Sequence, residues 1–219
     1  MQNKSRVSII LPVYNRRHLI MRAVNSVLEQ TIDSWELLIM DDGSTDGLEE
    51  LVLPLIIDNS QCRYFKHARR GVAATRNLGL HAATGEFITF LDSDDEYKPD
   101  HLSKRLDYMD QHPDVDIIHG GVELVGPPES FYVRDAFDPG RRIHLSECCI
   151  GATFFGKKQV FLKSGGFKHL PYSAESEFLP RVSALFHVDK VDFPTYIYYT
   201  GLQDSICTIV KNKTTNSDQ

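Results

Sequence analysis

Three carboxylates directly follow an apolar run in the middle of the chain. Residues 85–91 read GEFITFL, and Asp92, Asp94 and Asp95 come next. Such a run is typical of a buried β-strand, and negative charge at its end is costly unless a cation or a hydrogen-bonding ligand offsets it. Side chains two residues apart in an extended chain leave the same face, so Asp92 and Asp94 could share Mg²⁺ or Mn²⁺. The alternative is a solvated acidic turn that precedes a helix.

The composition limits the function classes. With 219 residues, 42% of them hydrophobic, the chain can bury the core of one large domain. Its net charge of -6 argues against a general nucleic-acid binder, so we expect no nucleic-acid partner. No apolar run is long enough to span a bilayer, and the first ten residues lack a signal-peptide core. These features predict a cytoplasmic protein without a transmembrane segment.

Apolar strand patterns alternate with helical patterns over the first half of the chain. Besides the run at 85–91, strands are expected at residues 7–12, 35–40 and 63–65, and helices at 19–28, 72–83 and 99–112. This alternation predicts an α/β fold with a mostly parallel sheet flanked by helices. Doubly wound sheets bind ligands beyond the carboxyl ends of their strands. The loops that follow Leu11, Met40 and Leu91 should therefore share one rim.

The pattern changes from residue 120 onward. Short strand candidates there are interleaved with proline and glycine, which suggests a smaller antiparallel addition. The candidates lie at residues 122–125, 130–133 and 152–156. A short helix at 157–163, a helix at about 175–185 and strands at 188–191 and 195–199 complete the expected fold.

Polar residues on the predicted rim suit a nucleotide diphosphate. Tyr14 could stack on a base, Asp42 could accept a hydrogen bond from a ring N–H, and Arg76 could reach a phosphate or a base. A metal could bridge Asp94 to the diphosphate. The structural alternatives are that Tyr14 packs at the sheet end and that Arg76 is a surface partner within its own helix. No P-loop or dinucleotide glycine motif is present.

In their order and spacing, four strings resemble the inverting family-two glycosyltransferases of the GT-A fold. The strings are residues 7–15, 39–46, 76–79 and 85–95. The resemblance is dense to about residue 113 and continues more weakly to about residue 181. It implies a GT-A (Rossmann-like) α/β fold. It also implies a metal-dependent transfer, with Mn²⁺ or Mg²⁺, of a sugar from a nucleotide diphosphate sugar to an acceptor hydroxyl.

The resemblance implies roles for the matching residues. Asp42 would bind the base, Asp94 would bind the divalent metal, and Asp92 would sit beside the ribose and the metal. Asp95 would lie close to the donor sugar. The further nucleotide-binding candidates are Pro12, Tyr14, Asn15, Arg76 and Ser93.

The general base is where this sequence departs from the family's pattern. The family usually carries a Glu-Asp pair at the start of the late helix, and the Asp is the base. Here the Asp position is Glu175, and it is preceded by Ala174. Either Glu175 or Glu177 could be the base. The sequence also leaves open whether the altered motif permits full activity.

The resemblance implies a nucleotide-sugar donor, with UDP favoured, and a saccharide or lipid-linked acceptor. Cell-surface polysaccharide or lipopolysaccharide assembly is the implied setting, and a lipid-linked acceptor would require peripheral association with the inner face of the membrane. We expect residues 1–119 to form the nucleotide-sugar-binding half. Residues 120–210 would form the acceptor-binding half of the same domain, and 211–219 a disordered tail.

Two other functions fit some of the residues. A non-catalytic nucleotide-sugar-binding protein is suggested by the altered Glu-Asp motif. A Mg²⁺-dependent phosphotransfer module also uses acidic strand ends. That module predicts a lone phosphoacceptor Asp with a Thr and a Lys on later strand ends, an order that the chain lacks.

Overall fold

The computed structural model describes residues 5–135, 138, 140–170 and 174–202. The tail predicted at 211–219 lies outside these residues. The helices are α1 (Ile20–Leu28), α2 (Leu48–Asp58), α3 (Val72–Ala82), α4 (His101–Gln111), α5 (Lys158–Lys163) and α6 (Ala174–Ser183). The strands are β1 (Val7–Val13), β2 (Trp35–Asp41), β3 (Cys62–Lys66), β4 (Phe87–Phe90), β5 (Glu96–Tyr97), β6 (Ile117–His119), β7 (Val122–Val125), β8 (Tyr132–Arg134), β9 (Arg142–His144), β10 (Phe155–Lys157), β11 (Val188–Lys190) and β12 (Tyr196–Tyr199). Short 3-10 turns are η1 (Pro128–Phe131), η2 (Leu145–Glu147) and η3 (Gly151–Thr153).

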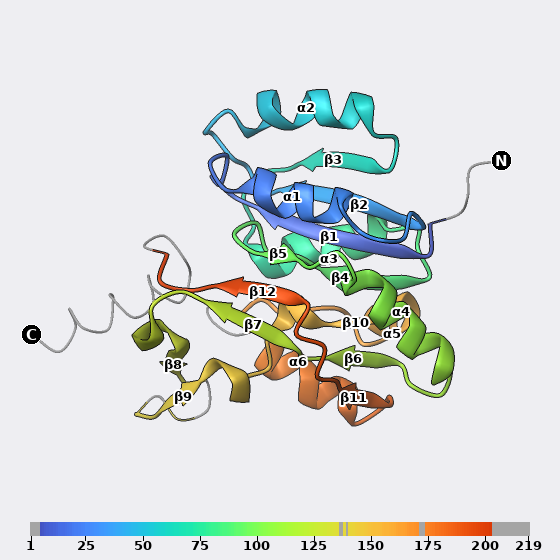
Figure 1. Cartoon of the computed structure of the whole chain (residues 1–219), viewed down its shortest axis with the longest axis vertical. Coiled ribbons are helices and arrows are strands. Elements are labelled where there is room, and N and C mark those ends of the chain that lie inside the picture. Colours follow the sequence, from blue (N-terminus) through green and yellow to red (C-terminus); the bar gives the residue numbers. More distant parts are fainter. Residues whose placement is uncertain (1–4, 136–137, 139, 171–173, 203–219) are drawn as a thin grey trace, which may run out of the picture.

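The central sheet has seven strands in the order β11-β6-β10-β4-β1-β2-β3 (Figure 1). Neighbouring strands are parallel except for β10, which is antiparallel to both β4 and β6. The predicted α/β fold with a mostly parallel sheet is thus confirmed. From β1 the chain moves outward through β2 to β3 and then returns to the other side of β1 for β4. The strand order reverses at β1, which is where doubly wound sheets bind their ligands.

The strand expected at residues 152–156 takes a different place from the one predicted. Residues Gly151–Thr153 form η3, and the strand begins at Phe155. This strand, β10, lies inside the main sheet and not in a separate addition. Gly156 permits the close approach, because a Cβ there would lie only 2.7 Å from the backbone oxygen of Asp116. The second half of the chain therefore completes the main sheet.

Helices cover both faces of the sheet and form two hydrophobic clusters. One cluster joins α1, α2 and α4 to the sheet, and the other joins α3, α5 and α6 to the opposite face. Alternate residues of β1 divide between them: Ile9 and Leu11 face the first cluster, and Ile10 faces the second. Strands buried on both faces explain the near-continuous apolar runs in the sequence.

Two small sheets lie beside the central one. In the first, β12 pairs antiparallel with β5 and parallel with β7. In the second, β8 and β9 form an antiparallel hairpin. The predicted small addition is present, although its larger sheet is mixed.

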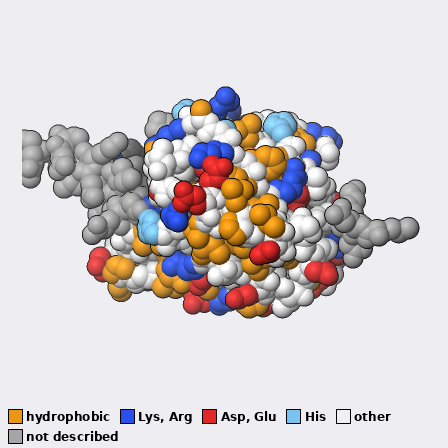
Figure 2. All heavy atoms as spheres, turned by 90° about the horizontal axis from the view of Figure 1, so that it is seen from above, with side chains coloured by type: hydrophobic (Ala, Val, Ile, Leu, Met, Phe, Trp, Pro, Cys, Tyr) orange, Lys and Arg blue, Asp and Glu red, His pale blue; other side chains and the backbone are white. Residues whose placement is uncertain are grey.

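The outer face of α2 carries exposed apolar side chains. Leu53 is 43% exposed and Ile57 is 83% exposed, and Figure 2, which looks down on this helix, shows apolar side chains gathered there. Within the described part of the chain, no helix is both long enough and apolar enough to cross a membrane.

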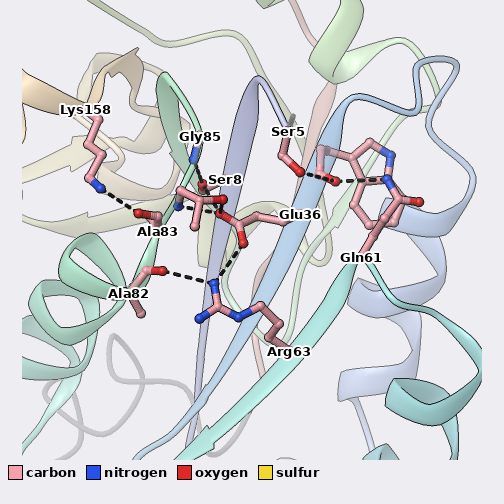
Figure 3. A network of polar contacts seen from close by, with 11 residues as sticks. Ser5, Ser8, Glu36, Gln61, Arg63, Ala82, Ala83, Gly85 and Lys158 are labelled. Carbon is pink, nitrogen blue, oxygen red and sulfur yellow. Dashed lines mark hydrogen bonds and ion pairs between the residues drawn. The ribbon is translucent and has the colours of Figure 1, made fainter. Parts of the chain in front are cut away.

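A buried carboxylate joins three strands at the end of the sheet opposite the loop that carries Asp92, Asp94 and Asp95, which we call the acidic loop. The Oε1 atom of Glu36 accepts hydrogen bonds from Ser8 Oγ at 2.6 Å and from Thr84 N and Oγ1 at 2.6 and 2.7 Å, while Arg63 Nη1 lies 3.0 Å from Oε2 (Figure 3). Ser8 Oγ in turn accepts from Gly85 N at 2.8 Å. Burial alone would raise the pKa of Glu36, but the hydrogen bonds from Ser8, Thr84 and Arg63 outweigh burial and hold the pKa below its usual value. The network fixes the start of β4 against β1 and β2.

We predict that Glu36→Gln lowers the free energy of unfolding by about 1–3 kcal/mol at pH 7, because Ser8, Thr84 and Arg63 lose a charged acceptor. A carboxyl with a lowered folded-state pKa stabilises the fold above its unfolded-state pKa of 4.5, and this stability is lost as the pH falls below that value. Urea unfolding of both proteins at pH 7 and near pH 3.5 measures the difference. An equal difference at both values would contradict the assignment.

Candidate active site

The loops after β1, β2 and β4 lie on one edge of the sheet. Asp42 N donates to Val13 O at 2.9 Å, and Leu91 N donates to Ile10 O at 3.1 Å, so the carboxyl ends of the three strands are level with one another. The shared rim that the strand pattern predicts is therefore formed. Every nucleotide-binding candidate except Arg76 comes from β1 or from one of these three loops.

The first two loops are tied together by Asn15. Its backbone has a positive φ of 49°, its Oδ1 accepts from Thr45 N at 2.9 Å, and its backbone N donates to Ser44 Oγ at 2.9 Å. Pro12 is buried inside β1, opposite Met40 of β2. Asn15 thus shapes the rim through its hydrogen bonds, and a contact of Pro12 or Asn15 with a nucleotide stays a prediction.

Tyr14 projects from the same rim with one ring face covered by an arginine. The guanidinium of Arg69 lies 3.6 Å from the centroid of the Tyr14 ring. Sequence reasoning missed Arg69, because it follows β3 in a loop that has no motif of its own. The pair makes a flat cationic and aromatic surface of the kind on which bases stack.

Asp42 organises the turn into α3. Its Oδ1 accepts from Arg70 N at 2.6 Å, and its Oδ2 accepts from Gly71 N at 2.9 Å. The ring nitrogen Nδ1 of His67 is 3.6 Å from Oδ1. In this arrangement both carboxylate oxygens hold the loop before α3, and base recognition by Asp42 stays a prediction.

Arg76 points inward from α3 and reaches the end of β4. Its Nη2 lies 2.7 Å from Asp92 Oδ1, and the side chain is almost fully buried. The guanidinium carbon is 5.6 Å from the ring centroids of both Phe90 and Phe167. Arg76 is therefore no surface partner within its own helix, and it pairs with one of the predicted site carboxylates.

The acidic loop after β4 concentrates negative charge. Burial raises the pKa of Asp94, the nearby Asp92 raises it further, and the charges of Arg16 and Arg22 oppose both effects. The pKa of Asp95 is raised well above its usual value by burial and then by Asp94 and Asp92. The loop is thus not the solvated acidic turn that the sequence left open.

Asp95 fastens this loop to β12. Its Oδ2 accepts from Tyr196 Oη at 2.7 Å, and its Oδ1 accepts from Tyr199 N at 2.8 Å. Tyr196 Oη also accepts from Asp92 N at 3.2 Å. The predicted contact of Asp95 with the donor sugar remains a prediction, because both of its oxygens here bond to β12.

Arg22 of α1 holds the loop from the other side. It donates to the backbone oxygen of Asp94, and its guanidinium carbon lies 3.6 Å from the Tyr199 ring centroid. Sequence reasoning missed Arg22, Tyr196 and Tyr199 as site residues. The three tyrosines of the strand are ordinary for a β-strand, and their partners lie about a hundred residues away in the sequence.

The acidic loop carries side chains that are suitable protein ligands for a divalent cation. The described residues contain no cluster of three or more metal-ligating side chains. Asp92 and Asp94 supply carboxylate oxygens, and a cation beside them would oppose the effects of burial and of Asp92, which both raise the pKa of Asp94. Ser93 between them is buried. A hard cation such as Mg²⁺ keeps waters and phosphate oxygens as its other ligands, so two carboxylates suffice.

Glu175 lies across the site on α6, near the buried Arg76. Both side chains lie next to Gly151 of η3. A Cβ built on this glycine would be 3.2 Å from Arg76 Nη1 and 3.4 Å from Glu175 Oε2. Burial alone would lower the pKa of Arg76, but the charges of Asp92 and Glu175 outweigh burial and raise it. One buried cation thus joins the acidic loop to α6, and Gly151 keeps open the space beside it.

Glu177 occupies a different environment one helical half-turn away. Arg181 Nε is 2.7 Å from Glu177 Oε1, and Lys168 Nζ is 2.8 Å from the same oxygen. These partners lower the pKa of Glu177 to about 2, chiefly through the hydrogen bond from Arg181. Arg181 also donates to Gly166 O at 2.8 Å, so Glu177 and Arg181 together attach α6 to the end of α5.

Residues 8–165 match the family described as Glycosyl transferase family 2. The chain belongs to this family. The match covers the rim, the acidic loop and the start of the second half, and it supports the resemblance read from the four sequence strings.

Curated relatives extend the family assignment. The putative colanic acid biosynthesis glycosyl transferase WcaA of Escherichia coli K12 is 38% identical over 184 residues, which are 80% of this chain and 63% of WcaA. The Escherichia coli UDP-Glc:alpha-D-GlcNAc-diphosphoundecaprenol beta-1,3-glucosyltransferase WfgD is 37% identical over 119 residues, 54% of this chain and 46% of WfgD. Three Rickettsia glycosyltransferases are far longer, and the chain spans 18%, 18% and 16% of their lengths.

Solved structures share the fold at low sequence identity. S. aureus TarS 1-349 in complex with UDP-GlcNAc has a TM-score of 0.75 at 20% identity, over 92% of this chain and 60% of that one. The mannosyltransferase PcManGT from Pyrobaculum calidifontis, in complex with GDP-Man and Mn²⁺, has a TM-score of 0.69 at 21% identity, over 90% and 57%. Together with the observed sheet, these likenesses establish the GT-A (Rossmann-like) fold.

We predict that Tyr196→Phe destabilises the protein by about 1–3 kcal/mol, because the buried Asp95 carboxylate loses a donor and the Asp92 N–H loses an acceptor. Tyr199→Phe is the matched control, since it removes only the half-buried bond from Tyr199 Oη to Glu96. Urea unfolding of the two variants compares the losses. A smaller loss for Tyr196→Phe than for Tyr199→Phe would refute this role of Tyr196.

Proposed function

We propose that the protein is a metal-dependent inverting glycosyltransferase. It would move a sugar from a nucleotide diphosphate sugar, with UDP favoured, to an acceptor hydroxyl. The observation that carries the proposal is the position of Arg76, which pairs with Asp92 of the acidic loop and lies beside Glu175 of α6. The carboxylate proposed to contact the donor and the proposed base therefore lie near one guanidinium in a family 2 fold.

The donor would bind along the rim. Its base would lie by Tyr14, Arg69 and Asp42, and its ribose and diphosphate would extend toward Asp92 and Ser93. Asp95 would come nearest to the donor sugar. It would either contact the sugar directly, after its hydrogen bonds to β12 rearrange, or act indirectly by holding the acidic loop in place. Pro12 and Asn15 would shape the wall of the base site. This arrangement is supported by the strand order, in which β4, β1 and β2 are neighbours.

Asp94, with Asp92, would hold Mn²⁺ or Mg²⁺. When bound, such an ion acts as a Lewis acid that stabilises negative charge on a departing diphosphate. The support is the pair of carboxylates on this loop, where Asp92 adds to the effect of burial on the pKa of Asp94, together with the Mn²⁺ named in the PcManGT complex. Arg22 would keep Asp94 in place through its backbone oxygen.

Glu175 would act as the general base. A base must accept a proton from the attacking hydroxyl, on the face opposite the leaving group, and a single displacement then inverts the anomeric carbon. Glu177 is unsuited to the task, because two cations hold its carboxylate and its pKa is lowered to about 2. Arg76 would position Glu175 by its charge.

The relatives support the donor and acceptor classes. WfgD is named for UDP-Glc and a diphosphoundecaprenol-linked GlcNAc, and the TarS complex holds UDP-GlcNAc. WcaA is named for colanic acid biosynthesis. We therefore propose a saccharide or lipid-linked acceptor in surface polysaccharide or lipopolysaccharide assembly. The corresponding location is the cytoplasm at the inner face of the membrane.

We predict that Glu175→Gln lowers turnover by about 10²–10⁴-fold without abolishing donor binding, because only the proton acceptor is lost. Glu177→Gln is the matched control. It should leave turnover close to that of the unchanged protein but lower the melting temperature, because its ion pairs with Arg181 and Lys168 are lost. Steady-state transfer assays and thermal unfolding measure both effects. Full activity of Glu175→Gln with an inactive, folded Glu177→Gln would reverse the assignment.

We also predict that UDP-sugars raise the melting temperature in the presence of Mn²⁺, since ligands that bind the folded state stabilise it. Asp94→Asn should abolish the part of the shift that depends on Mn²⁺. A panel of UDP, GDP, dTDP and CDP sugars, each with and without Mn²⁺, identifies the base. No shift with any of them would contradict the donor proposal, and tight binding without turnover on any acceptor would favour a non-catalytic binder.

A further inference from the structure

The β8–β9 hairpin has one face that combines arginines with aromatic rings. The register pairs Tyr132 with His144 and Arg134 with Arg142. Because side chains alternate along a strand, these four share one face. Tyr132, Arg134 and Arg142 are exposed. The ring of Tyr132 lies 5.1 Å from that of His144, and the Arg142 guanidinium carbon lies 5.8 Å from the Tyr132 ring centroid.

The two arginines stand directly across from each other without a carboxylate between them. Like charges in opposed positions destabilise an antiparallel pair, and among the described residues neither Arg134 nor Arg142 has an acidic partner within 4.0 Å. Arg142 Nη2 is anchored on backbone oxygens, those of Tyr132 at 2.8 Å and Glu129 at 3.2 Å. A bound anion would offset the repulsion, and guanidinium forks match phosphate oxygens.

The segments before and after the hairpin lead to residues of the candidate active site. It follows β7, whose Val125 O accepts from Thr200 N at 2.8 Å, and Ser130 Oγ is 2.5 Å from Thr200 Oγ1. Thr200 is next to Tyr199, which donates to Asp95. After β9 the chain passes through η2 to Gly151, beside Glu175. Figure 1 shows β8 and β9 beyond the end of β7. The hairpin is thus anchored at both ends to the predicted acceptor side.

Two acids of the hairpin make contacts elsewhere in it. Glu147 is 3.9 Å from Arg141, and Asp135 Oδ1 accepts from Asp138 N at 3.4 Å within the turn. These acids offset part of the positive charge of the arginines, and they therefore disfavour adsorption of the whole hairpin to an anionic bilayer. A discrete anion between the two arginines fits better than a charged surface.

We propose that this hairpin face binds the diphosphate of a lipid-linked saccharide acceptor, with Arg134 and Arg142 on the phosphate oxygens and Tyr132 against the adjoining sugar. The proposal rests on the proposed function and names the acceptor class for the same site. An aromatic ring offers an apolar surface to a sugar face, and two guanidinium groups supply paired donors to a diphosphate.

The test measures binding of farnesyl diphosphate by calorimetry, with saturating UDP and Mn²⁺ present so that the donor site is occupied. Arg134→Ala and Arg142→Ala should each weaken farnesyl diphosphate about tenfold, the loss of one charge-assisted contact. Arg141→Ala is the matched control, because it is exposed, adjacent and placed by alternation on the other face. It should bind farnesyl diphosphate as the unchanged chain does.

Farnesol and inorganic pyrophosphate are the other probes. Weaker binding of both than of farnesyl diphosphate supports a lipid-linked diphosphate. The proposal would be overturned if farnesol bound as tightly as farnesyl diphosphate. It would also be overturned if Arg134→Ala, Arg142→Ala and Arg141→Ala all weakened farnesyl diphosphate binding equally. Equal binding of pyrophosphate would overturn its lipid-linked part. UDP affinity should be the same in every variant, and a chain that binds no nucleotide would contradict the proposed function while leaving the hairpin comparison intact.

Discussion

The site depends on one buried positive charge. Arg76 leaves α3 beneath the rim, pairs with Asp92 at 2.7 Å and lies beside Glu175, while Phe90 and Phe167 flank its guanidinium. Taking such a cation out of water costs several kcal/mol unless neighbouring carboxylates offset it. Two acids from segments more than eighty residues apart are therefore held to one guanidinium. The ion pair with Asp92 ties the acidic loop to α3, and the charge of Glu175 on α6 acts on the same guanidinium.

The acidic loop shows a second constraint of the same kind. Asp95 is buried with its oxygens bonded to β12, and Arg22 holds the loop at the backbone oxygen of Asp94. These hydrogen bonds hold the loop in shape, and burial, followed by the charge of Asp92, raises the pKa of Asp94. The aspartates of this loop therefore differ in their surroundings because they occupy different positions. Neighbouring aspartates of identical chemistry differ because each meets different donors.

Much of the fold could be predicted because the strands are buried on both faces and the helices are amphipathic. The apolar runs of β1, β2 and β4 are evident in the sequence, and the rule for doubly wound sheets predicts the rim that they share. β10 was misplaced because a three-residue strand carries no signal of its partners. The sequence could not favour Glu175 over Glu177 as the proposed base. That preference depends on the ion pairs of Glu177 with Arg181 and Lys168, and on the space that Gly151 leaves beside Glu175.

The sequence by itself determined the α/β architecture, the family and the residues able to do chemistry, because periodicity and local motifs are properties of contiguous segments. Only the tertiary structure decided which environment each carboxylate occupies. Asp92, Asp95 and Glu175 take their environments from Arg76, Tyr196 and Gly151, which are distant in the chain. Burial and hydrogen bonding set the charge of a group, and both arise from packing between elements, which no local pattern encodes.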